Sequence, residues 1–248
     1  MLYIEKAGLS KDMEYDDSVY PFTLPVIQKL DQLNFRKPIT FFSGENGSGK
    51  STLLEAIAIA YGFNPEGGTR NFNFSSRDTH SSLHEVFYLK RGPARAEDGF
   101  FLRAESFYNL ASEIDNLDKV PFTPPYLKYY GGVSLHEVSH GEGFLNLVLN
   151  RFQGNGLYIM DEPESALSPT GQFALLSWMY QLSIKSHSQF IIATHSPILM
   201  SCPNAEILEV HDDGKIISTP YKETLNYILY KRFLNDERML EELLKEEA

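Results

Sequence analysis

Cysteine is nearly absent from this chain of 248 residues, which has only Cys202. A single cysteine excludes an intramolecular disulfide framework and is typical of proteins in a reducing cytosol. Long apolar runs are also missing, because no stretch reaches the roughly 18 residues that a membrane-spanning helix needs. Residues 1–6 lack the basic-then-apolar order of a secretory signal. These absences predict a cytoplasmic protein with no transmembrane segment of its own.

Basic residues are outnumbered by acidic ones. The chain has 22 Lys and Arg but 33 Asp and Glu, which gives a formal net charge of −11. This balance excludes a surface that attracts nucleic-acid phosphates everywhere. A local basic patch stays open, because several basic residues gather in the first half of the chain. They are Arg70, Arg77, Lys90, Arg91, Arg95 and Arg103. The simpler interpretation is a solvated face with scattered charge.

Internal repeats and sustained heptads are missing too, so no long coiled-coil arm is expected. Apolar residues make up 42% of the chain, enough for a real core. Short apolar runs alternate with helical patterns along the sequence. Expected strands are residues 2–4, 39–42, 83–90, 100–105, 157–160, 190–193, 207–210 and 215–218, and expected helices are residues 26–33, 50–61, 141–152, 169–187 and a segment from 224. This alternation predicts an α/β fold with a mostly parallel central sheet flanked by helices.

Two further features refine the expected organisation. Residues 207–210 and 215–218 would pair as a hairpin through the turn at residues 212–214, which adds an antiparallel portion. Residues 63–135 carry Gly and Pro turns and are expected to form a lid or small helical insertion. We expect residues 1–248 to form one domain.

A glycine-rich turn lies between the strand at residues 39–42 and the helix from Lys50. Residues 44–51, GENGSGKS, fit the pattern G-x-x-x-x-G-K-[ST]. Glycines let successive backbone N–H groups converge on phosphate oxygens, and the helix adds its N-terminal partial charge. Lys50 would reach the β- and γ-phosphates and Ser51 would bind Mg²⁺. The alternative is a glycine-rich turn that only caps a helix.

Two adjacent acids follow the buried strand at residues 157–160. At this strand end Asp161 could orient Mg²⁺, and Glu162 could polarise an attacking water. The alternative is an acidic loop that caps a helix. His195 follows the next buried strand and could stabilise the γ-phosphate, although a structural role is the alternative. His80 and His84 have no further ligand at metal-binding spacing, so we expect no zinc site.

Together these motifs resemble the ABC-type ATPases, a class of P-loop NTPase. Residues 44–51 look like the Walker A loop, residues 157–162 like Walker B with its catalytic glutamate, residues 165–168 like the D-loop, and His195 like the switch histidine. The residues of these motifs are more similar to those of soluble ATPases of the SMC, RecF and OLD type than to those of transporter subunits. The resemblance implies that ATP is bound by the Walker A residues, namely Gly44, Glu45, Asn46, Gly47, Ser48, Gly49, Lys50, Ser51 and Thr52. It also implies that Lys50, Glu162 and His195 are catalytic.

A variant of the family's signature lies 22 residues before Asp161 (161 − 139). Ser139, Gly141 and Gly143 resemble its phosphate cradle, whereas His140 and Glu142 depart from the pattern. The resemblance implies that this cradle grips ATP held by a second copy. The resemblance implies that Glu105, at the end of the strand at residues 100–105, stands where the family has a metal-contacting glutamine, so that Glu105, Ser51 and Asp161 are the candidate metal ligands. The aromatic ring that stacks on adenine stays open between Tyr15, Tyr20 and Phe22.

These features predict an Mg²⁺-dependent ATPase that closes as an ATP-dependent, head-to-tail homodimer. The resulting switch would act on an effector protein or on DNA. One alternative is the nucleotide-binding subunit of a membrane ABC transporter. It is disfavoured because residues 105–139 contain three prolines and offer little helical subdomain. Another alternative is a module that holds ATP without hydrolysing it, with Glu142 disabling the site in trans.

Overall fold

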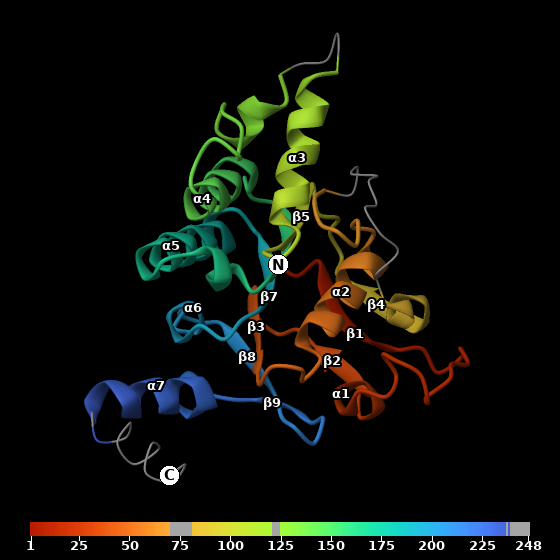
Figure 1. Cartoon of the computed structure of the whole chain (residues 1–248). Helices are drawn as coiled ribbons and strands as arrows, with labels where there is room; N and C mark the ends of the chain where they lie inside the picture. Colours follow the sequence, from red (N-terminus) through yellow and green to blue (C-terminus); the bar gives the residue numbers. More distant parts are fainter. Residues whose placement is uncertain (70–80, 121–124, 237, 239–248) are drawn as a thin grey trace.

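The computed structural model describes residues 1–69, 81–120, 125–236 and 238, and within these ranges it contains two β-sheets (Figure 1). The larger sheet has six strands in the order β5-β6-β7-β3-β8-β9, and the smaller has three in the order β2-β1-β4. The strands are β1 Ile4–Leu9, β2 Gln32–Asn34, β3 Ile39–Gly44, β4 Phe87–Arg91, β5 Asp98–Arg103, β6 Gly156–Asp161, β7 Gln189–Ala193, β8 Glu206–Val210 and β9 Ile216–Ser218. Neighbours from β5 to β8 run parallel, and β9 closes the edge as an antiparallel strand. The expected α/β fold is confirmed.

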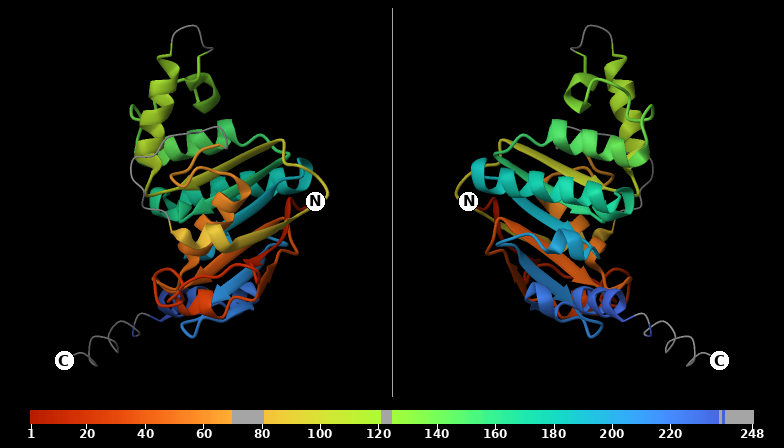
Figure 2. Two further views of the ribbon diagram at one scale, coloured as in Figure 1. Left: turned by 90° about the vertical axis from the view of Figure 1, so that its right-hand side faces the viewer. Right: turned by 90° about the vertical axis from the view of Figure 1, so that its left-hand side faces the viewer.

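Helices and the smaller sheet cover the two faces of the larger sheet. The helices are α1 Pro25–Gln28, α2 Lys50–Tyr61, α3 Phe107–Asp118, α4 His140–Arg151, α5 Pro169–Lys185, α6 Pro197–Met200 and α7 Leu225–Asn235, with short 3-10 helices η1 Ser82–Val86, η2 Leu127–Tyr130, η3 Pro163–Ala166 and η4 Tyr221–Glu223. Helix α2 and the smaller sheet pack on one face, whereas α4 and α5 pack on the other (Figure 2). Helix α3 extends away from the sheet.

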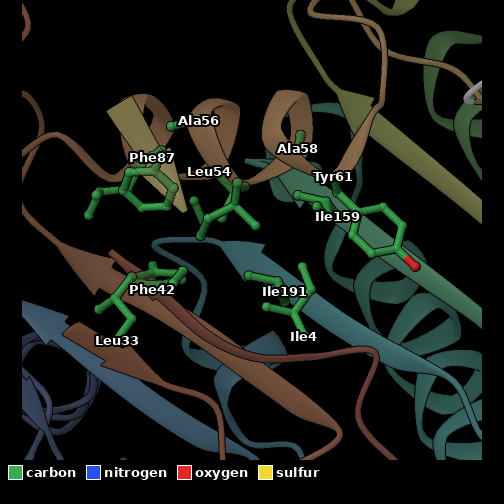
Figure 3. Packing of buried hydrophobic residues seen from close by; sticks show 14 of the residues in the cluster. Ile4, Leu33, Phe42, Leu54, Ala56, Ala58, Tyr61, Phe87, Ile159 and Ile191 are labelled. Carbon is green, nitrogen blue, oxygen red and sulfur yellow. The ribbon is translucent and has the colours of Figure 1, made fainter. Parts of the chain in front are cut away.

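Alternate residues of the central strands supply two separate hydrophobic clusters. Ile159 and Ile191 face α2, where Leu54 packs on them (Figure 3). Tyr158 and Phe190 face the opposite cluster with α4 and α5. Strands β6 and β7 are therefore buried along their whole length. A strand covered on both faces favours apolar residues on both sides, which explains the apolar runs at residues 157–160 and 190–193.

The side chain of Gln189 attaches the smaller sheet to the larger one. Its Oε1 accepts hydrogen bonds from Tyr3 N at 2.7 Å and Ile4 N at 2.9 Å, and its Nε2 donates to Ile4 O at 2.9 Å. Gln189 is fully buried, so these bonds satisfy a polar group that would otherwise be costly to bury.

Several element boundaries differ from those expected. The strand expected at residues 2–4 is β1 Ile4–Leu9, and the helix expected at 26–33 is reduced to α1 Pro25–Gln28 before β2. The strand expected at 83–90 is wrong in its first half, where η1 turns Leu83 and Val86 into the core beside α2. Both residues are apolar at a spacing of three, which a 3-10 turn can bury as well as a strand can.

Helix α3 corrects the expectation that residues 105–139 contain little helical structure. It has 12 residues, and Phe107, Leu110, Ala111 and Ile114 form its buried face. The three prolines of this stretch lie at positions 121, 124 and 125, after the helix has ended. They therefore do not interrupt its hydrogen bonds.

Some predictions lie outside the described residues. These concern Arg70, Arg77, His80, Pro121, Pro124 and the acidic end of the chain. Over the ranges that are described, no helix combines the length and the apolar character that crossing a bilayer requires.

Candidate functional site

The glycine-rich turn connects the end of β3 to the start of α2. Gly47 and Gly49 adopt left-handed backbone angles, with φ of 79° and 92°. A Cβ on Gly49 would lie 2.6 Å from Val26 Cγ1, so this position has neither the conformation nor the space for another residue. No side chain caps the first turn of α2. Its N–H groups are therefore available to an external anion.

Lys50 is the first residue of α2, and its side chain folds back over the turn. Its Nζ donates to Gly44 O at 3.0 Å and to Glu45 O at 2.8 Å. Lys50 is buried, and burial lowers the pKa of its ammonium, although the nearby carboxylates of Glu162 and Asp161 act in the opposite direction. Among the described contacts, Lys50 Nζ is hydrogen-bonded to neutral carbonyl and hydroxyl oxygens.

Ser51 and Asp161 meet across the end of the sheet. Ser51 Oγ donates to Asp161 Oδ1 at 2.9 Å. Asp161 is the last residue of β6 and is buried, and this burial raises the pKa of its carboxyl to about 6. Hydroxyl and carboxylate oxygens are ligands that Mg²⁺ prefers, and a divalent cation would offset the cost of burying the carboxylate. The pair fits a magnesium site on these grounds.

Glu162 and His195 face one another beside this pair. Glu162 is not a glycine, yet it has a φ of 48°, a strained conformation that recurs at functional sites. Its Oε1 lies 3.8 Å from His195 Nε2. Burial lowers the pKa of His195, and the nearby Lys50 lowers it further against the opposite effect of Glu162, which favours the neutral imidazole. His195 Nε2 is buried without a hydrogen-bond partner in the structure, which leaves it available to a ligand.

Backbone contacts fix the position of His195. Glu164 Oε1 accepts a hydrogen bond from His195 N, and Asn226 Nδ2 donates to His195 O at 2.9 Å. Sequence reasoning did not identify either residue. Asn226 belongs to α7, which lies 31 residues further along the chain, so no local pattern could indicate it (226 − 195).

An open pocket of about 260 Å³ lies next to these residues. It is lined by Tyr20, Leu24, Asn46, Gly47, Gly49, Lys50, Ser51, Thr52 and Glu162. Of the three candidate aromatics, Tyr20 is 64% exposed and its hydroxyl lies 3.1 Å from Thr52 Oγ1. Phe22 is buried and stacks on Tyr15 instead, with ring centroids 4.5 Å apart. Only Tyr20 among the three contributes to the pocket.

The signature-like segment forms the N-terminus of α4. Ser139 caps this helix, because its Oγ accepts from Glu142 N at 3.3 Å and donates to Glu142 Oε2 at 2.9 Å. A Cβ on Gly141 would lie 3.0 Å from Ala166 O, and one on Gly143 would lie 3.1 Å from Leu135 O. Both glycines thus permit close backbone approach. Among the described contacts, no hydrogen bond joins this segment to the glycine-rich turn of the same chain.

Glu105 does not join the Ser51–Asp161 pair. Its side chain is 87% exposed, and its carboxylate lies 3.6 Å from Arg103 Nη2. Arg103 in turn lies 3.8 Å from Asp161 Oδ2. From the sequence, Arg103 belonged either to a local basic patch or to scattered surface charge, whereas in the structure it lies against the candidate metal site.

The strand ends of the mostly parallel sheet bring together the glycine-rich turn, the Ser51–Asp161 pair, Glu162 and His195. This arrangement of fold and site is that of an ABC-type P-loop ATPase. Comparison of the sequence with known families agrees, since the AAA domain matches residues 25–247 and the chain belongs to that family. The expected membership of the ABC-type P-loop ATPase superfamily is confirmed.

Two curated proteins illustrate the relationship. The chain is 29% identical over 161 residues to YxlF of Bacillus subtilis, an uncharacterised ABC transporter ATP-binding protein, in an alignment that covers 61% of this chain and 51% of YxlF. It is 28% identical over 224 residues to the nisin transport ATP-binding protein NisT of Lactococcus lactis, covering 80% of this chain and 35% of NisT. The chain therefore spans about half the length of the first relative and about a third of the second.

A solved structure supports the fold. The Smc head domain of Pyrococcus furiosus, determined with an extended coiled coil and bound to the C-terminal domain of ScpA, superposes with a TM-score of 0.50. The match covers 94% of this chain and 100% of that chain at 14% identity. At this identity the likeness concerns the fold alone.

Proposed function

We propose that this chain binds and hydrolyses Mg²⁺·ATP. The observation that carries the proposal is the 2.9 Å contact of Ser51 with Asp161 directly beside the buried Lys50. Phosphate oxygens would replace the carbonyls that now accept from Lys50 Nζ and would receive the uncapped N–H groups of α2. Tyr20 is best placed to stack on adenine. When bound between Ser51 and Asp161, Mg²⁺ would neutralise charge on the transferred phosphoryl group.

Glu162 and His195 are proposed to act on the attacking water. The Glu162 carboxylate lines the pocket and can accept a proton from water or orient it. The neutral imidazole of His195 has an unpaired buried Nε2 that can hydrogen-bond to the γ-phosphate or to water. Glu105 remains a candidate metal ligand, but only if its exposed carboxylate moves from Arg103 toward Ser51.

The nucleotide pocket is open, and we propose that a second copy of the chain closes it. Ser139, Gly141 and Gly143 of that copy would then approach the γ-phosphate head to tail. The absence of a described hydrogen bond between this segment and the glycine-rich turn of the same chain supports this arrangement. Hydrolysis would reopen the dimer and change its affinity for an effector protein or DNA. We propose that this switch acts in the cytoplasm and that residues 1–248 form one domain.

Replacement of Glu162 tests the proposal. Glu162→Gln keeps the size of the side chain but removes the base, so turnover should fall by about 10²–10⁴-fold while ATP binding persists. ATP should then accumulate on a species with the mass of a dimer, measured by light scattering. Glu223→Gln, an exposed acid of η4, is the matched control and should behave as wild type. Turnover by Glu162→Gln at the wild-type rate would remove Glu162 from the mechanism.

A transporter subunit stays the second candidate function, because α3 supplies the helical segment whose absence argued against it. Both curated relatives are also named as transport ATP-binding proteins. Such a subunit would purify with an integral membrane protein when it is isolated from detergent-solubilised membranes. Purification without a membrane partner, together with ATP-dependent dimerisation, would favour the soluble switch.

A further inference from the structure

Arg103 connects the candidate metal site to α2. It is the last residue of β5, and the parallel register places it opposite Asp161, the last residue of β6. Its Nη1 donates to Glu55 Oε2 at 2.8 Å, and its Nε lies 3.8 Å from Asp161 Oδ2. The Arg103 side chain is only 21% exposed. A permanently charged guanidinium is therefore held between the metal-site acid and the second turn of α2.

Each oxygen of the Asp161 carboxylate faces a different neighbour. Oδ1 accepts from Ser51 Oγ, whereas Oδ2 faces Arg103 Nε. Burial of a charged carboxylate costs free energy unless a cation lies nearby. The carboxylate oxygen nearer to that cation is oriented toward it. Arg103 thus favours the orientation in which Oδ1 points toward Ser51.

The far end of Arg103 is anchored. Glu55 is buried, and its second oxygen accepts a hydrogen bond from Ser81 N at 2.9 Å. Arg103 Nε, by contrast, is buried and has no hydrogen-bond partner. Buried donors are almost always paired. The contact between β5 and α2 uses Arg103 Nη1 and leaves Nε–H free. This unpaired donor lies next to Asp161 Oδ2.

We propose that Arg103 is a positioning residue for the magnesium site. It acts through Asp161 and does not itself touch the nucleotide. This inference rests on the proposed function. It differs from a purely structural role, in which the Arg103–Glu55 pair only joins two elements of the core.

Equilibrium binding of a fluorescent ATP analogue at increasing Mg²⁺ concentration tests the inference without relying on turnover. Partners that orient a metal ligand typically change metal affinity about 10–100-fold when they are removed. Arg103→Met should therefore raise the half-saturating Mg²⁺ concentration about 10-fold. Binding of the analogue in EDTA should stay within about twofold of wild type, because Lys50 and the glycine-rich turn are unchanged. Arg103→Lys retains the charge and should restore part of the Mg²⁺ affinity.

Arg151, the last residue of α4, offers a matched control because its partner Asp98 lies at the opposite end of β5. Its Nη1 lies 2.8 Å from Asp98 Oδ1, and its side chain is 22% exposed. Asp98 begins β5, far along the strand from Arg103. A purely structural role predicts that Arg103→Met and Arg151→Met behave alike, with lower thermal stability and wild-type Mg²⁺ dependence. Our inference predicts that only the Arg103 variant shifts the Mg²⁺ dependence.

The outcomes distinguish a failure of the proposed Arg103 role from a failure of the proposed ATP binding. Wild-type Mg²⁺ dependence in both Arg103 variants would overturn the inference and leave the proposed ATPase intact. If Arg103→Met fails to fold, Arg103→Lys alone decides, since the same comparison applies to it. Failure of the wild-type chain to bind the ATP analogue at any Mg²⁺ concentration would overturn the proposed function itself.

Discussion

Helices α2 and α4 each present an N-terminus for which the sequence suggested phosphate binding, but the two termini are built differently. Helix α2 begins after Gly49 without a capping side chain, and its first residue is Lys50. Helix α4 begins with a complete capping box, in which Ser139 and Glu142 satisfy each other's backbone N–H groups. The first terminus is therefore open and cationic, whereas the second is closed and carries a carboxylate.

This difference indicates how the two termini would contribute to binding one nucleotide in the proposed dimer. The N-terminus of α2 can bind a polyanion in the isolated chain, because nothing has to be displaced except the carbonyl contacts of Lys50. At α4 a phosphate must compete with Glu142 Oε2 for the Ser139 hydroxyl. We therefore expect the α4 terminus to contribute only when a second copy brings it to bound nucleotide at high local concentration.

Within the comparison of the two termini, removal of the cation at α2 should have the greatest effect. Lys50→Ala should weaken ATP binding about 100-fold or more, since it deletes charge-assisted hydrogen bonds worth about 1.5–3 kcal/mol each. Isothermal titration with ATP and Mg²⁺ measures the loss. Lys37→Ala removes an exposed lysine near the opposite end of β3 and should leave affinity unchanged. Equal affinities of the two variants would contradict the assignment of the α2 terminus as the primary site.

Local sequence was enough to predict the α2 terminus. The residues that shape the turn are neighbours in the chain, so their spacing alone fixes which N–H groups converge. Asp161 could be added because parallel strands end at one edge of the sheet. Arg103 could not be assigned in this way, since its position depends on the register of β5 with β6, 58 residues away (161 − 103). Helix α3 could have been found, because its buried residues recur at helical spacing from Phe107 to Ile114.

The second-largest effect should come from the cap of α4. Ser139→Ala removes the hydroxyl and should lower turnover about 10-fold at high protein concentration, while ATP binding by the monomer stays unchanged. It also removes an N-cap worth about 1 kcal/mol, which corresponds to a fall in Tm of roughly 2–4 °C for a chain of this size. Steady-state turnover and calorimetry measure the two effects.

Ser139→Thr separates the two roles of the hydroxyl. Threonine also caps helices, so this variant should recover both the stability and most of the turnover. If Ser139→Ala loses stability but hydrolyses ATP as fast as wild type, then Ser139 is only a helix cap. The likeness of residues 139–143 to a trans-acting cradle would then be wrong.

The smallest expected effect is the most informative about why the two termini differ. Glu142→Gln leaves the capping box intact, because glutamine accepts the same backbone hydrogen bond, yet it removes the negative charge beside the incoming phosphate. A surface charge at this range is worth some tenths of a kcal/mol to about 1 kcal/mol, so ATP-dependent dimerisation should strengthen about 2–5-fold. Glu137→Gln removes a nearby exposed acid outside the cap and should change dimerisation less. If Glu142→Gln instead weakens the dimer while stability is unchanged, the carboxylate makes a favourable contact with the second copy, and the α4 terminus is not a phosphate cradle in this protein.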